Sequence, residues 1–152
     1  MLKEILDLKN RKILFQLDVD CRQSDSEIGK KVGLSKQTVA YRINNLVKEG
    51  FITRFTSVID TYKLGYQKYK IYLSFENANT GIITEITNFL VENKKTEWVA
   101  TCSGKWDLIV GYLVKDVYEF NEALKELDEK YSQFILSREI TVILGVPHWR
   151  KE

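Results

Sequence analysis

The chain has 152 residues and a formal net charge of +2, a length that allows one medium domain or two small ones. Hydrophobic residues make up 44% of it and charged residues 29%, which is ordinary for a soluble folded protein. The N-terminus lacks a signal-peptide core, and no apolar run approaches the roughly 20 residues of a membrane-spanning helix, so we expect a cytoplasmic protein without a membrane partner.

Residues 5–17 predict a first helix, because their apolar side chains recur near one face of a 3.6-residue period. These apolar positions are Ile5, Leu8, Ile13, Leu14 and Leu17. Asp7 is suited to the N-cap of this helix, since its carboxylate can accept hydrogen bonds from unpaired backbone N–H groups. A polar break over residues 18–23 separates this helix from the next.

A short helix over about residues 25–31 and a tight turn follow. Ser24 and Glu27 have the spacing of a capping box, in which each side chain satisfies the other residue's backbone donor. Gly33 suits the left-handed position that ends a helix, and Ser35 suits the N-cap of the following one. Two short helices joined in this way are typical of a helix-turn-helix motif.

The second helix of this motif should run over about residues 36–48. Its predicted buried stripe is Val39, Ile43, Leu46 and Val47. Its predicted open face carries Lys36, Gln37, Thr38, Tyr41, Arg42 and Asn45, with Ser35 at its start. Amide, hydroxyl and cationic groups of this kind read base edges and bind phosphates, although a merely solvated helix also has a polar outer face. Residues 22–54 hold seven Lys or Arg against three Asp or Glu, an excess that favours contact with double-stranded DNA.

Residues 51–59 are β-branched and aromatic, which predicts one or two short strands and therefore a winged variant of the motif. Gly50 should end the preceding helix. Arg54 lies within the wing, where it suits contact with a backbone phosphate as well as it suits an ordinary exposed position. We expect a winged helix-turn-helix domain over residues 1–59.

The second half of the chain has a different periodicity, after a short structured connector at residues 60–66. Strands are predicted at residues 69–75, 97–102, 106–114 and 139–146. Helices are predicted after Thr80 and after the capping pattern of Asp116 and Glu119. The order β-α-β-β-α-β is that of a ferredoxin-like domain, here over residues 67–152, and the whole protein is therefore expected to be of the α+β class.

Both helices of such a domain lie on one face of the sheet, so the opposite face of a monomer should be polar. Strand alternation instead places four large apolar side chains on that face: Tyr72, Ile109, Leu113 and Ile143. Each one left in water forgoes about 1.5–3 kcal/mol of burial. A two-fold dimer through this face is the expected solution, and coverage by the connectors or tails is the alternative.

The sequence contains no recognisable catalytic set. The single histidine, His148, follows the only proline near the chain end and has no evident catalytic partner. Cys21 and Cys102 lie far apart, without the spacing of a zinc site. No phosphate-cradling glycine motif is present. We therefore expect no enzyme activity, no metal and no cofactor.

The run from Leu8 to Ile59 resembles the DNA-binding half of the Lrp/AsnC family, the leucine-responsive or feast/famine regulators of prokaryotes. The matching residues are Ile13, Leu14, Leu17, Arg22, Glu27, Ile28, Val32, Gly33, Leu34, Ser35, Val39, Arg42, Ile43, Leu46, Gly50, Phe51 and Ile52. One departure is Asn10, which stands where the family usually has aspartate.

Residues 101–110 resemble the Gly-x-x-Asp hairpin of the family's effector and oligomerisation domain, often called the RAM domain. The resemblance implies dimers that assemble into tetramers or octamers, and a small effector such as an amino acid bound near Gly104, Trp106 and Asp107. Trp106 departs from the family, where a smaller aromatic is usual. A purely structural turn, with Gly104 permitting it and Asp107 capping it, is the alternative reading of this hairpin.

The sequence therefore predicts a sequence-specific, DNA-binding transcriptional regulator of the Lrp/AsnC type. Two recognition helices from one dimer should meet half-sites of a pseudo-palindromic operator about one helical turn apart, or a multiple of it. The alternative is an amino-acid-binding oligomeric module, or a small ferredoxin-like enzyme, without a role on DNA. That alternative leaves the pattern of residues 24–52 unexplained.

Overall fold

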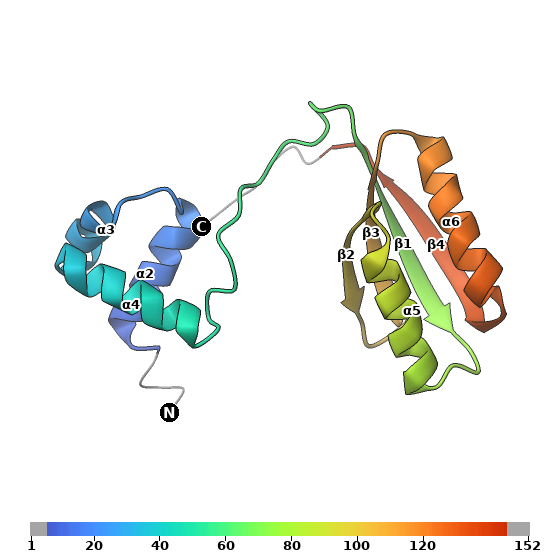
Figure 1. Ribbon diagram of the computed structural model, residues 1–152, viewed down its shortest axis with the longest axis horizontal. Coiled ribbons are helices and arrows are strands. Elements are labelled where there is room, and N and C mark those ends of the chain that lie inside the picture. Colours follow the sequence, from blue (N-terminus) through green and yellow to red (C-terminus); the bar gives the residue numbers. More distant parts are fainter. Residues whose placement is uncertain (1–5, 146–152) are drawn as a thin grey trace. The chain divides into compact units, whose positions relative to one another are not determined.

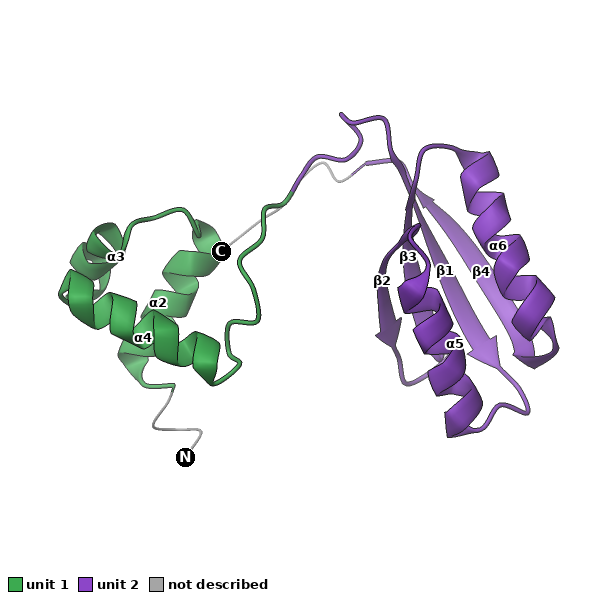
Figure 2. Ribbon diagram, in the orientation of Figure 1, with its two compact units in different colours: residues 1–58, 149–152 green, residues 59–148 purple. Residues whose placement is uncertain are grey.

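The computed structural model describes residues 6–145, which divide into two compact units between Val58 and Ile59 (Figure 2). Each unit has its own hydrophobic core. The predicted domain limits at residues 1–59, 60–66 and 67–152 set a connector apart from the second unit, and this division stays a prediction.

The first unit is built from the helices α2 (Leu8–Val19), α3 (Asp25–Val32) and α4 (Lys36–Lys48) (Figure 1). They enclose a small core of Ile13, Ile28, Val32, Val39 and Leu46. Two predicted inward residues are instead exposed, Leu8 by 67% and Val47 by 43%. Leu8 precedes Ile13 by five residues, which places it nearly half a turn away around the helix. Ile5 lies outside the described residues.

The predicted helix ends are confirmed. The Asp7 carboxylate accepts from the backbone N–H of Asn10 at 2.7 Å. Ser24 and Glu27 form the complete capping box. Gly33 ends α3 with φ of 67°, in the left-handed region. These features depend on residues next to one another in the chain, which explains why local sequence patterns predicted them.

The predicted strands over residues 51–59 are wrong, because this segment has no regular secondary structure and pairs with no strand in residues 6–145. Its apolar side chains Phe55, Val58 and Ile59 are each more than half exposed. A β-strand needs a neighbour to accept and donate its backbone hydrogen bonds. The composition of the segment thus favours a strand, but the neighbour is missing from the chain that the structure describes.

The second unit has the predicted β-α-β-β-α-β order. Its elements are β1 (Gln67–Phe75), α5 (Thr80–Glu92), β2 (Thr96–Thr101), β3 (Leu108–Val114), α6 (Val117–Tyr131), the 3-10 turn η1 (Ser132–Phe134) and β4 (Ile135–Ile143). The antiparallel sheet has the order β2-β3-β1-β4, and both helices lie over the same face (Figure 1). The ferredoxin-like prediction is confirmed. Several limits differ from the prediction. The largest difference is that β4 begins four residues earlier than predicted, and Asn79 rather than Thr80 caps α5.

The face of the sheet opposite the helices is mixed rather than apolar. The four predicted side chains on it, Tyr72, Ile109, Leu113 and Ile143, are half-buried. The same face carries Lys68 and Lys70, because alternate residues of β1 point to it. The Trp98 indole covers Gly111 on the neighbouring strand and leaves no room there for a Cβ.

Tyr112 offers a test of the second unit's core. Its side chain is 1% exposed, and its hydroxyl lies beside that of its cross-strand neighbour Thr96, which partly offsets the effect of burial on its pKa. Within residues 6–145 neither hydroxyl makes a hydrogen bond of good geometry. Burial raises the pKa of Tyr112 to about 12. Tyr112→Phe removes an unsatisfied buried hydroxyl, so the variant should be more stable at neutral pH by about 1 kcal/mol.

The same substitution should change how the free energy of unfolding depends on pH in the alkaline range. In the unfolded chain this tyrosine ionises near pH 10, so the wild type loses stability as the pH rises from 10 to 12. The full loss is roughly 3 kcal/mol, from a pKa difference of about 2. Urea unfolding at pH 8 and pH 11 should show the advantage of Tyr112→Phe increasing with pH. An advantage that does not change with pH would contradict this account.

Candidate nucleic-acid interface

The outward side of α4 carries a continuous row of polar side chains. Its members are spaced by four, three and four residues, which keeps them along one line of the helix: Gln37, Tyr41, Asn44 and Lys48. All four are exposed, Tyr41 by 67%. We call these four residues the outer row. They lie opposite the stripe of Val39 and Leu46, which is fully buried.

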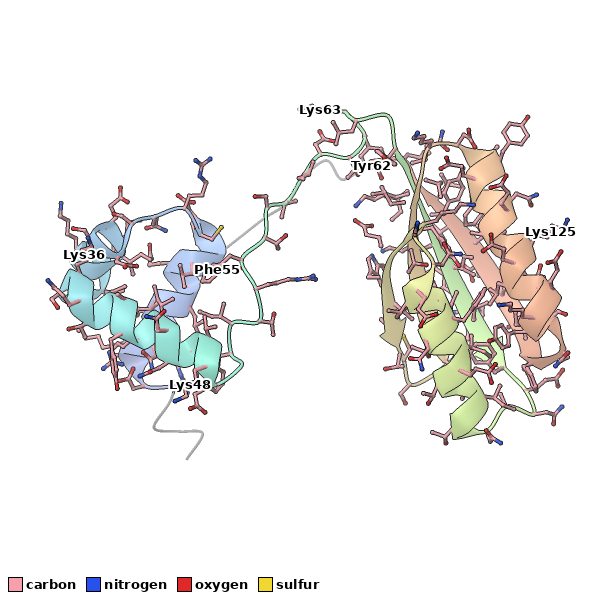
Figure 3. All side chains as sticks on the ribbon, viewed as in Figure 1. Lys36, Lys48, Phe55, Tyr62, Lys63 and Lys125 are labelled. Carbon is pink, nitrogen blue, oxygen red and sulfur yellow. The ribbon has the colours of Figure 1, made fainter. Side chains whose placement is uncertain are left out.

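Only part of the predicted open face coincides with this row. Lys36, Gln37 and Tyr41 are exposed as expected, and Figure 3 shows Lys36 and Lys48 at opposite ends of α4. Thr38, Arg42 and Asn45 are half-buried, so the prediction is wrong in placing them on the open face. They lie on one flank of the helix, beside its buried stripe.

The sequence reasoning missed Asn44 and Lys48. Both follow Gln37 by a helical repeat, at seven and eleven residues, so a helical projection centred on Gln37 would have found them. The prediction listed Gln37 and Tyr41 together with Thr38, Arg42 and Asn45. The outer row therefore shares only part of the predicted face.

The start of α4 is fixed by hydroxyl groups. The Ser35 Oγ accepts from the backbone N–H of Thr38 at 3.2 Å and lies 2.8 Å from the Thr38 Oγ1. Both hydroxyls are thus engaged with each other at the helix N-terminus. The backbone N–H groups of a first helical turn favour an anion nearby, which suits a phosphate at this end of α4.

The turn before α4 brings two backbone segments unusually close. A Cβ at Gly29 would stand 2.6 Å from the carbonyl oxygen of Leu34. The backbone N–H of Leu34 donates to the carbonyl of Gly29 at 3.0 Å. Glycine at this position therefore allows α3 and the start of α4 to approach each other, and this approach sets the angle at which α4 is presented.

Arg42 contacts the first helix. Its Nη1 donates to the Asp7 Oδ2 at 2.7 Å and to the Asn10 Oδ1 at 2.9 Å. The pKa of Asp7 is lowered, first by the hydrogen bond from the Asn10 backbone and then by that from Arg42. Asn10 is one of the few buried polar residues, 8% exposed. Asn10, which stands where the Lrp/AsnC family usually has aspartate, is therefore one of these two partners of Arg42.

The remaining predicted residues are not part of α4. Arg54 is exposed on the segment after α4, where it lines a shallow groove together with Arg22 and the end of α2. Gly104 has φ of 134° and no atom near its Cβ position. Both belong to loops rather than to a helix or strand.

Asp107 fastens the hairpin to β1. Its carboxylate accepts from the backbone N–H of Phe75 at 2.8 Å, and its own N–H donates to the carbonyl of Leu73 at 2.8 Å. The ring centroids of Trp106 and Tyr72 are 5.9 Å apart. The Lys105 ammonium nitrogen lies 4.5 Å from the centroid of the Trp106 ring. The structural reading of Asp107 is therefore well supported, and Trp106 is the hairpin residue that packs against Tyr72.

Within residues 6–145 no group of three His, Cys, Asp or Glu side chains is arranged to hold a metal ion. Among the described helices, none is both long enough and apolar enough to cross a membrane.

Comparison with known proteins agrees with this geometry. Residues 6–53 match the family model of winged helix-turn-helix DNA-binding domains. An HTH-type transcriptional regulator of Pyrococcus horikoshii, PH1055, is 30% identical over 128 residues, covering 84% of this chain and 80% of the relative.

Solved structures extend the likeness to the second unit. An AsnC family transcriptional regulator from Agrobacterium tumefaciens has a TM-score of 0.82 at 20% identity, covering 97% of this chain and 95% of its own. The transcriptional regulator NMB0573 of Neisseria meningitidis, solved as a complex with L-Met, has a TM-score of 0.79 at 17% identity, covering 97% of this chain and 96% of its own.

Proposed function

Because this chain belongs to the Lrp/AsnC family of DNA-binding transcriptional regulators, we propose that the outer row of α4 is its sequence-reading surface. The exposure of Gln37, Tyr41, Asn44 and Lys48 along one line carries this proposal. An α-helix fits the major groove of B-DNA, where each base pair presents a distinct pattern of donors and acceptors.

The amide side chains of the outer row suit contacts with bases, and the lysines at the two ends of α4 suit contacts with the DNA backbone. The amides of Gln37 and Asn44 each offer a donor and an acceptor, the pair that matches the N6 and N7 groups of adenine. The ammonium groups of Lys36 and Lys48, at the two ends of α4, suit the phosphates on either side of the groove. We assign Arg54, exposed beside the first unit, to a phosphate contact as well.

The active form proposed is a dimer, or a larger assembly of dimers, in which the sheet faces opposite the helices meet. Tyr72, Trp98 and Trp106 supply that face with aromatic area, which is enriched in protein interfaces. Two copies of α4 related by a two-fold axis would read a pseudo-palindromic operator. Each half-site would present the same bases to the outer row.

A small effector of the amino-acid class is proposed at the hairpin of residues 102–107. The Neisseria neighbour was solved with L-Met, and in this chain Trp106 with Tyr72 forms an aromatic surface beside the exposed Lys105. A carboxylate ligand would suit the Lys105 ammonium. Trp106 is larger than the family's usual residue, so an effector here must be accommodated beside the indole.

A salt titration of binding tests the proposed reading surface. Binding of the protein to a duplex selected from a random pool should weaken steeply as salt rises, since each phosphate neutralised adds about 0.9 to the slope of log K against log salt. Lys48→Ala should lower that slope by about 0.9. The matched control, Lys125→Ala, removes an exposed lysine of α6 in the second unit and should leave the slope unchanged.

The result can fail in two distinct ways. A slope near zero for the wild type would refute DNA binding through phosphates. A wild-type slope that Lys48→Ala does not change would remove the C-terminal end of α4 from the interface and would contradict the proposed orientation of the helix.

A further inference from the structure

Arg42 connects two helices that are far apart in the sequence. It extends from α4 to the start of α2, where Asp7 and Asn10 accept from the same nitrogen at 2.7 and 2.9 Å. Asp7 is also the N-cap of α2, because the backbone N–H of Asn10 donates to its other carboxylate oxygen. The contact therefore joins α4 to the capped start of the first helix.

The surroundings of this contact favour a stable bond over a mobile one. The Arg42 side chain is 26% exposed and Asn10 is 8% exposed, while the Asp7 side chain is 41% exposed. A charged guanidinium that is partly removed from water is held strongly by a carboxylate and an amide oxygen together. In this position Arg42 is on the flank of α4 and turned away from the line of the outer row.

We propose that Arg42 is a positioning residue, which fixes the rotation of α4 about its own axis through Asp7 and Asn10 and thereby aims the outer row at DNA without contacting DNA. This inference rests on the proposed function of the outer row. It assigns to the start of α2 a role in recognition, in addition to its role in folding.

The physical reason lies in the difference between apolar and polar contacts. The buried stripe of α4 packs against Ile13 and Ile28, but burial of apolar surface is not directional and resists a small roll of the helix only weakly. Hydrogen bonds to a charged group are directional. A roll of about 20° moves a side-chain tip on a helix of 5–6 Å radius by roughly 2 Å. Base-edge hydrogen bonds do not survive such a shift.

Asp7→Asn tests the proposal through the sign of its effect. Asparagine is as good an N-cap as aspartate, so α2 keeps its start while the partner of Arg42 loses its charge. Removing a negative charge should by itself strengthen binding to anionic DNA. The proposal predicts the opposite: binding to a duplex selected by the wild type should weaken by about tenfold.

Arg42→Lys and Arg42→Ala complete the set. Both should weaken binding while leaving the slope of log K against log salt at the wild-type value, and the double variant of Asp7→Asn with Arg42→Ala should be no weaker than Arg42→Ala alone. The matched control is Glu49→Gln, which removes an exposed carboxylate at the end of α4 and should bind as well as the wild type or better. All measurements are made where circular dichroism shows every variant fully folded.

Three results would overturn the proposal. If the Asp7→Asn variant bound as tightly as the wild type or more tightly, Arg42 would have no positioning role. A fall of about 0.9 in the salt slope of Arg42→Ala would make Arg42 a phosphate contact. If the variants at Asp7 and Arg42 lost stability but kept full affinity for the duplex, the contact between these residues would serve folding alone. Failure of the wild type to bind any selected duplex would instead count against the proposed function.

Discussion

Replacing Gly29 by alanine should destabilise the first unit by about 2 kcal/mol, the cost of forcing an extra methyl group into a packed site. The added Cβ would stand 2.6 Å from the carbonyl oxygen of Leu34, and that oxygen belongs to the backbone. A flexible side chain could move aside, but a backbone carbonyl can move only if the turn opens. Opening the turn would also lengthen the 3.0 Å hydrogen bond from the Leu34 N–H to Gly29.

The consequence extends to DNA binding. Because α4 begins at Lys36, directly after this turn, a shift of Leu34 changes the angle of the recognition helix. Thermal unfolding followed by circular dichroism should show a lower midpoint for Gly29→Ala, and affinity for a selected duplex should fall with it. Gly81→Ala is the control, because its Cβ would meet only a side-chain oxygen of Asn79 at 3.2 Å. Equal stability of Gly29→Ala and the wild type would contradict the close approach.

Gln37→Ala and Asn44→Ala should each weaken binding to the preferred duplex by about 1–3 kcal/mol, the usual value of a side chain that reads a base. Neither amide carries charge, so the salt slope should stay the same. The loss should appear as relaxed specificity: duplexes with a changed base at one position of the half-site should bind the variant almost as well as the preferred duplex does.

Competition assays on duplexes that differ by single base pairs measure this directly. Asn45→Ala is the matched control, since it removes the same amide group from the half-buried flank of α4. We expect its specificity profile to follow that of the wild type. If Asn45→Ala relaxed specificity and Asn44→Ala did not, the reading face would be the one that the sequence predicted and not the outer row.

The features that the sequence predicted well are those set by near neighbours in the chain. The capping box of Ser24 and Glu27 and the left-handed Gly33 each involve residues within one turn of a helix. The order of strands and helices in the second unit was predicted for the same reason, since alternating and helical periodicities are local patterns. Element limits were less accurate, as β4 shows by starting at Ile135.

The misplaced residues depend on contacts between distant parts of the chain. Arg42 was expected on the open face because its position is polar, whereas its partner Asp7 lies 35 residues earlier. Likewise the carboxylate of Asp107 binds the backbone of Phe75, 32 residues away. Residues 51–59 have the composition of a strand, but composition cannot supply a neighbouring strand. Periodicity alone also leaves the exact rotation of α4 undetermined by about one residue.

Parallel selection from one random pool of duplexes tests most directly whether the outer row of α4 reads the DNA sequence. Wild type, Gln37→Ala and Asn45→Ala are each allowed to select bound sequences. We expect the wild type and Asn45→Ala to select the same pseudo-palindromic sequence, while Gln37→Ala selects sequences that have lost the preference at one symmetric pair of positions. An unchanged preference in Gln37→Ala, or no enriched sequence for the wild type, would contradict the account.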